Sequence, residues 1–167
     1  MLLVSIIMGS TSDYPVMEKA AAFLDEMEIP FEMNALSAHR TPAEVEEFAS
    51  HAEERGVRVV IAGAGMAAAL PGVIAASTTL PVIGVPIKGM LDGLDAMLSI
   101  IQMPPGIPVA TVGVNGALNA AILAAEMLAL SDEALSARLK AYKEGLKQKI
   151  VKANAELAEV KFRFKVN

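Results

Sequence analysis

The chain has 167 residues, of which 54% are hydrophobic and 20% charged, with a formal net charge of −5. This composition excludes intrinsic disorder, and an acidic chain with 4% aromatic residues has no electrostatic footprint for nucleic acid. Because cysteine is absent and only two histidines occur, disulfides, thiolate metal ligands and a structural zinc site are excluded.

The mean hydropathy of +0.47 is high, but Gly, Pro or charged residues interrupt every apolar run before the ~18 residues of a membrane helix. The N-terminal Met1–Val4 has no basic region of the kind that opens a signal peptide. We therefore expect a single cytoplasmic domain over 1–167, with no membrane or nucleic-acid partner, whose excess apolar residues form buried strands and subunit interfaces.

A short, almost continuous apolar run at Leu2–Met8 predicts a first strand that is buried on both faces. It ends in the segment Gly9–Pro15, where Ser12 or Asp13 can cap the following helix. Apolar residues at helical spacing predict the inward face of that helix, namely Val16, Ala20, Phe23, Leu24 and Met27.

The second strand is predicted at Phe31–Leu36, and the hexapeptide Ser37–Pro42 (SAHRTP) follows it. A helix is then predicted from Thr41 to Arg55, because a proline suits a first helical turn and apolar residues recur along one face. His51 lies beside the acidic face of this helix, and we interpret it as a surface residue. The inward positions are Val45, Phe48, Ala49 and Ala52.

Three further strands are predicted at Val57–Ala62, Leu80–Val85 and Val109–Val112. The first of these leads into a glycine-rich loop, Gly63–Gly72, and a helix that is apolar on nearly every side follows at Asn115–Leu130. A shorter helix is predicted after the fourth strand, with its inward face formed by Leu94, Met97, Leu98 and Ile101.

The core domain is expected to cover 1–130, with residues 131–167 forming a C-terminal helix and tail. Strict alternation over Val160–Val166 predicts a terminal strand that packs on another chain. Before it, a long apolar stripe at helical spacing predicts a helix that reaches a neighbouring subunit; the stripe comprises Leu135, Leu139, Tyr142, Leu146, Ile150, Ala153 and Leu157.

Strands that begin about 25 residues apart and alternate with helices are typical of a parallel sheet with right-handed crossovers. The predicted fold is a three-layer α/β/α sandwich of flavodoxin or Rossmann type with about five strands. Ligands bind outside the carboxyl ends of such strands. Three unusual loops therefore meet at one edge: Gly9–Asp13, Ser37–Arg40 and Gly63–Leu70.

These loops favour a pocket for phosphate and ribose that one histidine faces. The first loop offers hydroxyls and backbone N–H groups at a helix start, and Asp13 can accept from ribose hydroxyls. His39 can transfer a proton near neutral pH, and Arg40 suits phosphate or carboxylate. The third loop has almost no side chains, so a flat ligand can lie against it. Each loop taken alone also fits an ordinary turn or helix cap.

Other chemistries lack their motifs. The third loop is not G-x-G-x-x-G, and no Walker lysine pattern or G-x-S-x-G nucleophile elbow occurs in the chain. The residues thus indicate proton transfer on a small phosphorylated ligand, with no cofactor and no metal.

The combination of motifs resembles the N5-carboxyaminoimidazole ribonucleotide mutase family of purine biosynthesis. The resembling segments cover most of 2–130 in order, and only the region after Leu130 is generic. They are MGSTSD (8–13), SAHRTP (37–42), AGAG (62–65), LPG (70–72), LPVIGVP (80–86), LDGLDAMLSIIQMPPGIPVATV (91–112) and NAAILAAE (119–126).

The resemblance implies a homo-octamer that moves a carboxylate from nitrogen to C4 of aminoimidazole ribonucleotide, without a cofactor. It implies that His39 is the general acid/base and that Arg40 contacts the substrate. Ser10, Ser12 and Asp13 would bind the ribose phosphate. The remaining contacts would surround the imidazole and its carboxylate; they are Ser37, Ala38, Gly63, Ala64, Gly65, Ala69 and Leu70.

The third loop departs from the family pattern GAGGAAHLPG, because Met66 replaces a glycine and Ala69 replaces a histidine. A related class carboxylates aminoimidazole ribonucleotide directly with carbon dioxide. That class tends to have alanine at the position of Ala69, as here, but lysine at the position of Arg40. Direct carboxylation is therefore one alternative. A non-catalytic flavodoxin-like module that binds a nucleotide or flavin is another, and an inactive scaffold, which the presence of His39 and Arg40 argues against, is a third.

Overall fold

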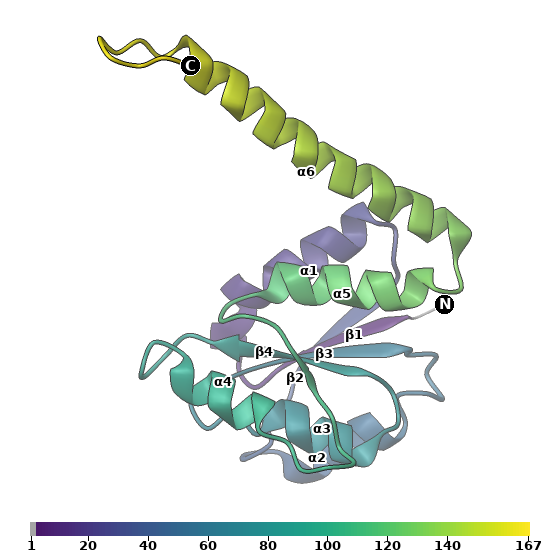
Figure 1. Cartoon of the computed structure of the whole chain (residues 1–167). Coiled ribbons are helices and arrows are strands. Elements are labelled where there is room, and N and C mark those ends of the chain that lie inside the picture. The colour runs from purple at the N-terminus through teal and green to yellow at the C-terminus, as the bar shows by residue number, and fades with distance from the viewer. Residues whose placement is uncertain (1–2) are drawn as a thin grey trace.

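A computed structural model describes residues 3–167 as one parallel sheet between two helical layers (Figure 1). The strand order is β2-β1-β3-β4-β5, the order of flavodoxin-like sheets. The predicted fold class is thus confirmed, although Leu2, the predicted start of the first strand, lies outside the described residues. The strands are β1 (Val4–Met8), β2 (Phe31–Ala35), β3 (Val59–Gly65), β4 (Val82–Ile87) and β5 (Ala110–Thr111).

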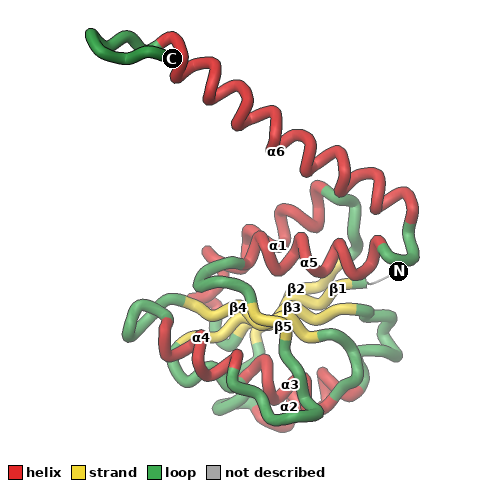
Figure 2. The backbone as a smooth tube through the Cα atoms, viewed as in Figure 1, coloured by secondary structure: helices red, strands yellow, loops and turns green. Residues whose placement is uncertain are grey.

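Two hydrophobic cores lie on the two faces of the sheet. One face is covered by α1 (Tyr14–Glu26), α5 (Ala117–Ala129) and the first turns of α6 (Glu133–Glu159). The other is covered by α2 (Pro42–Ser50), α3 (Leu70–Ser77) and α4 (Leu94–Ile101), as Figure 2 shows. Within residues 3–167, no helix combines the length and the apolarity needed to cross a membrane.

The strand sequences account for their positions in the sheet. Every residue of β1 and β4 is buried, as continuous apolar runs predict for central parallel strands, whereas β2 is a half-buried edge strand. Ser5 is a polar residue that is buried inside β1, and its hydroxyl is satisfied because it donates to Glu32 Oε1 on β2 at 2.9 Å. Arg55 donates to the same carboxylate oxygen at 3.3 Å.

The sequence interpretation missed α3 and misplaced some boundaries. α3 begins with Leu70-Pro71-Gly72, which resembles a loop, but a proline is compatible with a first helical turn. β3 starts two residues later than predicted and continues to Gly65, so the first glycines of the predicted loop belong to a strand. α2 ends at Ser50 rather than Arg55, and His51 is exposed, as predicted.

The predicted inward face of α4 is wrong. Ala96 and Ile100 are buried there, whereas Leu94, Leu98 and Ile101 are 58%, 43% and 55% exposed. The reason lies in β4: Gly84 has no side chain, and a Cβ at that position would collide with Ile100 Cγ2. Ile100 therefore packs on the sheet above Gly84, and the face of α4 that carries Leu94 and Leu98 turns toward solvent.

The first turns of α6 pack on the domain, and the rest projects away from it (Figure 1). Leu135 and Leu139 are buried, and the Tyr142 ring meets Phe23 edge to face with centroids 5.1 Å apart. The predicted strand at 160–166 is wrong, because these residues form a turn after α6. Lys165 Nζ donates instead to the carbonyls of Leu157 and Ala158, which lie at the end of the helix.

Candidate active site

A cavity of about 760 Å³ lies at the carboxyl ends of β1, β2, β3 and β4. The cavity spans the boundary between β1 and β3. At this boundary the order in which successive strands are added to the sheet reverses, and open α/β sheets bind their ligands at such a point. All predicted site residues except Gly63 line it. The lining comprises Gly9, Ser10, Ser12, Asp13, Ser37, Ala38, His39, Arg40, Ala64, Gly65, Met66, Ala67, Ala69, Leu70, Ile87, Lys88, Gly89 and Met90.

The loop after β1 presents hydroxyls and a helix start to the cavity. Ser10 is extended and caps a short 3-10 turn (Thr11–Asp13), accepting at Oγ from the Ser12 N–H at 3.3 Å. The Ser12 hydroxyl also donates to Ser10 Oγ, at 3.0 Å. The two hydroxyls are therefore held side by side, in an arrangement that suits hydrogen bonding to an anion.

Arg40 ties the loop after β2 to the loop after β1. Its Nη2 donates to the Gly9 carbonyl at 2.9 Å, and its Nε donates to Ser37 Oγ at 3.2 Å. Thr41 closes the turn, since its hydroxyl accepts from the Ser37 N–H and donates to the Ser37 carbonyl. These bonds fix the backbone on both sides of His39, whose exposed ring makes no hydrogen bond within residues 3–167.

Asp13 is the acidic group of the cavity. Partial burial raises the pKa of its carboxyl above the ordinary value of 3.8, while a backbone hydrogen bond at Ser10 and the positive charge of Arg40 act in the opposite direction. A half-buried carboxylate next to two hydroxyls can accept hydrogen bonds from sugar hydroxyl groups.

The end of β3 and the start of α3 form an apolar wall. Ala64, Gly65 and Ala69 present little side chain, so a flat ring can approach the backbone closely. Met66 adopts a left-handed conformation with φ of 52°, at the position where the family pattern has glycine. Gly63 does not line the cavity and packs instead against Met17 of α1. A side chain at this position would not fit, because its Cβ would lie 2.5 Å from Met17 Sδ.

The segment after β4 also lines the cavity, and sequence reasoning did not assign it to the site. Lys88, Gly89 and Met90 belong to no recognisable chemical motif. They reach the cavity because β4 pairs with β3, with Ile87 opposite Gly65. The pairing of Gly65 with Ile87 depends on strand order, which local sequence patterns do not specify.

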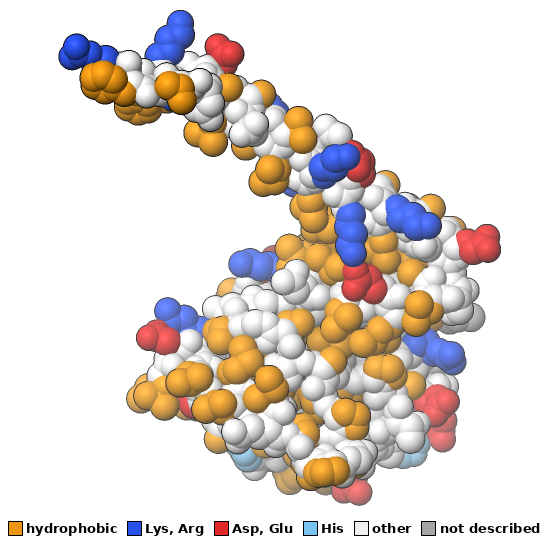
Figure 3. Space-filling view, viewed as in Figure 1, with side chains coloured by type: hydrophobic (Ala, Val, Ile, Leu, Met, Phe, Trp, Pro, Cys, Tyr) orange, Lys and Arg blue, Asp and Glu red, His pale blue; other side chains and the backbone are white. Residues whose placement is uncertain are grey.

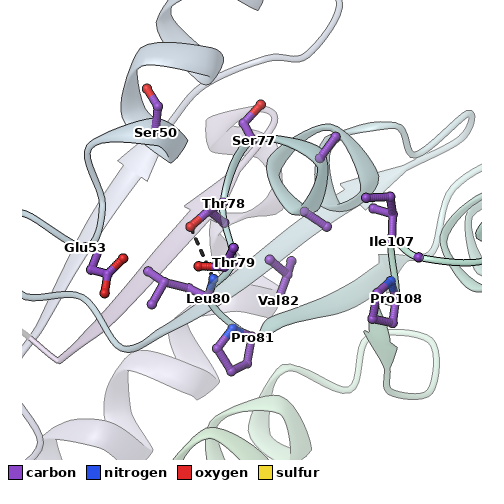
Figure 4. A pocket seen from close by; sticks show the side chains of 13 residues that line it. Ser50, Glu53, Ser77, Thr78, Thr79, Leu80, Pro81, Val82, Ile107 and Pro108 are labelled. Carbon is purple, nitrogen blue, oxygen red and sulfur yellow. Dashed lines mark hydrogen bonds between the residues drawn. The ribbon is translucent and has the colours of Figure 1, made fainter.

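A second hollow of about 820 Å³ lies at the opposite edge of the sheet (Figure 4). Several of its hydroxyls are already used, as when Thr78 Oγ1 accepts from the Leu80 N–H at 3.3 Å and Ser77 donates to the Val73 carbonyl. Glu53 is the only titratable residue in its described lining. The cavity at the carboxyl ends of the strands, the carboxyl-edge cavity, is slightly smaller but contains more titratable side chains.

The carboxyl-edge cavity suits an anionic ligand and proton transfer. Its described lining contains a histidine, a carboxylate and two cations, Arg40 and Lys88. In residues 3–167, no group of three or more His, Asp or Glu residues lies close enough together to hold a metal ion. The fold and this cavity define the class: a parallel α/β protein with a candidate small-molecule site at the point where its strand order reverses.

Comparison with known proteins narrows this class to a family. A profile described as AIR carboxylase matches residues 3–149. The N5-carboxyaminoimidazole ribonucleotide mutase of Pyrococcus abyssi is 59% identical over 87% of this chain and 84% of its own length. The mutase of Thermotoga maritima is 50% identical over 98% of this chain and 96% of its own length.

The crystal structure of Treponema denticola PurE superposes with a TM-score of 0.84 at 32% identity, covering 94% of this chain and 99% of that chain. The family profile matches most of the chain, and the relatives are similar over nearly their whole length. The chain belongs to the AIR carboxylase family.

Proposed function

We propose that this protein is an isomerase of purine biosynthesis that converts N5-carboxyaminoimidazole ribonucleotide into 4-carboxy-5-aminoimidazole ribonucleotide. The observation that carries the proposal is the cavity that joins His39 and Arg40 to the hydroxyl loop after β1. Relatives that are 50–59% identical are named as mutases for this reaction. The proposed setting is the cytoplasm, and no cofactor takes part.

The proposed binding mode uses the two halves of the cavity differently. The substrate phosphate binds Ser10, Ser12 and the Arg40 guanidinium, where hydroxyls, backbone N–H groups and positive charge converge. Asp13 accepts hydrogen bonds from the ribose hydroxyls. The imidazole lies against Ala64 and Gly65, whose small side chains permit close approach, with Ser37 and Ala38 on its other side.

His39 supplies both proton transfers. The bond between N5 and the carboxylate carbon breaks, carbon dioxide leaves, and the electron pair on N5 takes a proton from the His39 imidazolium. The C4 carbon of the resulting enamine-like ring attacks carbon dioxide. Neutral His39 then removes the C4 proton, and the C–H electron pair restores the aromatic ring. Protons and charge balance, and the histidine returns to its starting form.

Trapped carbon dioxide requires a site that excludes water. In the single chain the cavity mouth is open, with Met66 and Met90 60% and 68% exposed. We infer that a second copy of the chain completes the enclosure in a homo-oligomer, which the family resemblance indicates is an octamer.

The decisive assay gives the purified protein N5-carboxyaminoimidazole ribonucleotide without bicarbonate, ATP or metal and follows the formation of the 4-carboxy compound spectroscopically. Turnover under these conditions supports the mutase. Activity restricted to aminoimidazole ribonucleotide plus carbon dioxide would support direct carboxylation instead. A yellow protein that turns over neither substrate would favour a flavin-binding module.

The role of His39 is tested with His39→Asn, which keeps the size and much of the hydrogen bonding of the side chain but removes its basicity. Turnover should fall by about 10²-fold or more, with substrate affinity largely retained. His51→Asn is the matched control, because His51 is exposed just after the end of α2 and lies outside the cavity. Near-normal turnover in His39→Asn would contradict the proposed mechanism.

A further inference from the structure

Within residues 3–167, two basic side chains line the cavity, and they enter it from opposite ends. Arg40 follows β2, whereas Lys88 follows β4, and β1 and β3 lie between them. The Arg40 guanidinium reaches the Gly9 carbonyl after β1, beside the hydroxyl loop, whereas Lys88 extends from the end of β4, two strands further along the sheet. The two cations therefore serve different parts of the cavity.

The backbone of Lys88 is firmly positioned. Its N–H donates to Asn115 Oδ1 at 2.9 Å, and the Asn115 N–H donates to the Pro86 carbonyl at 2.8 Å. Asn115 adopts a left-handed conformation, with φ of 57°, to make both contacts. The end of β4 is thus held against the loop that precedes α5, which fixes the backbone of Lys88 at the cavity lining.

The ammonium group of Lys88, in contrast, is loosely held. Its Nζ lies 3.3 Å from Asp92 Oδ1, but the two side chains are 58% and 89% exposed. Ion pairs with this exposure contribute little stability because water screens them. The side chain can therefore leave Asp92 and turn into the cavity when an anionic group is bound there.

We propose that Lys88 is a specificity-determining residue that binds the migrating carboxylate; this inference rests on the proposed function. The wall formed by β3 and α3 offers a carboxylate no charged side chain, since Ala64, Met66 and Leu70 are apolar. A carboxylate moved into this half of the cavity loses water and needs a cation or N–H donors. Lys88 is the cation within the described lining of that half.

The stereochemistry of the reaction gives Lys88 and His39 complementary positions. After C4 attacks carbon dioxide, that carbon is tetrahedral and carries its proton and the new carboxylate on opposite faces of the ring. The base and the cation that holds the carboxylate must therefore approach from opposite sides. His39 follows β2 and Lys88 follows β4, at the two ends of the cavity.

The test compares two ligands that differ only in the carboxylate: 5-aminoimidazole ribonucleotide and 4-carboxy-5-aminoimidazole ribonucleotide, titrated by calorimetry. Lys88→Met should bind the carboxylated ligand about tenfold to a hundredfold more weakly, the range expected for loss of a charged hydrogen bond. Its affinity for the uncarboxylated ligand should stay within about twofold, since no contact to that ligand is lost. Lys88→Arg should recover most of the difference.

Asp92→Asn is the matched control. It breaks the same ion pair but keeps the ammonium, so affinity for the carboxylated ligand should be unchanged or slightly higher. Circular dichroism checks the fold of each variant, and Lys88→Gln replaces Lys88→Met if the latter is misfolded.

Equal weakening for both ligands would overturn the proposal, since it would mean that Lys88 contacts the phosphate. Unchanged affinity for both would overturn it as well. Failure of the proposed function has a separate signature in the wild-type protein. A protein with another function would bind neither ribonucleotide, and a direct carboxylase would bind both but would not turn over N5-carboxyaminoimidazole ribonucleotide.

Discussion

Asp13 is a half-buried carboxylate at the start of α1, in a cavity built for an anion. Because burial raises its pKa in the folded state, the folded protein holds the carboxyl proton more tightly than the unfolded chain does. Ionised Asp13 therefore destabilises the free protein above that pKa. The penalty disappears as the pH falls below 3.8, where the carboxyl is protonated in both states.

We expect Asp13→Asn to raise the melting temperature of the ligand-free protein at pH 7 while it lowers substrate affinity. The gain in stability should shrink as the pH falls toward 4. Thermal melts from pH 4 to 8 measure it, and Asp25→Asn, at an exposed position of α1, controls for the loss of one negative charge. A gain that stayed constant over this range would contradict burial as its cause.

Met66 occupies a left-handed backbone conformation that favours glycine. Met66→Gly should stabilise the protein by about 0.5–1 kcal/mol, because relief of the strained φ outweighs the greater freedom of glycine in the unfolded chain. Urea denaturation measures the change. Met66→Ala removes the same exposed side chain but keeps the strain, so a midpoint for Met66→Gly no higher than that of Met66→Ala would show that the backbone is unstrained.

Among the elements, α6 combines two different environments. Its first turns bury Leu135 and Leu139 on the domain, while Leu146, Ile150 and Leu157 continue the same stripe at 43%, 71% and 63% exposure. An apolar helical face that continues beyond its own domain is typical of a segment that meets another chain. Figure 3 shows the hydrophobic side chains gathered along α6 and over the body.

Deletion of the residues after Glu159 should weaken assembly but leave the domain folded. The deleted segment carries the exposed Phe162 and Phe164, and Lys165 Nζ donates to two carbonyls at the end of α6. Light scattering should report a lower mass at micromolar concentration, with the thermal melt of the domain nearly unchanged. A full-length variant with both phenylalanines changed to serine separates the loss of apolar contacts from the loss of chain length.

Element types were predictable where one physical signal dominates. The buried strands and α5 follow from continuous apolar runs, and the polar site loops follow from the rule that such loops share the carboxyl edge. Pairwise packing was not predictable: Gly84 decides which face of α4 turns inward, and only strand order brings Lys88 to the cavity. The alternation after Glu159 predicted a strand that has no partner strand within the described chain.

At the scale of the whole molecule, the outward face of α4 is a second exposed apolar surface, in addition to the exposed half of α6. Leu94, Leu98 and Ile101 lie on it, and Oδ1 of Asp95 is buried without a hydrogen-bond partner in residues 3–167. A lone buried acceptor costs free energy, which a donor from another copy can offset. Both surfaces fit the proposed homo-oligomer.

Leu98→Glu should lower the mass measured by light scattering at micromolar protein, because it places a charge in the centre of this apolar face. Turnover should fall with it, since the inferred enclosure of the cavity needs a neighbouring copy. Leu130→Glu is the control, because Leu130 is 90% exposed at the turn between α5 and α6, away from α4. An unchanged mass for Leu98→Glu would exclude α4 from the interface.

The open mouth of the cavity also governs how the molecule responds to oxidants. Cysteine is absent, so the thioethers are its sulfur targets, and Met66 and Met90 are far more accessible than the buried Met8 and Met17. Oxidation to sulfoxide would convert an apolar rim into a polar one while leaving both cores intact. A neighbouring copy that closes the mouth would shield the same two sulfur atoms, so assembly would protect this protein chemically at the place where it acts.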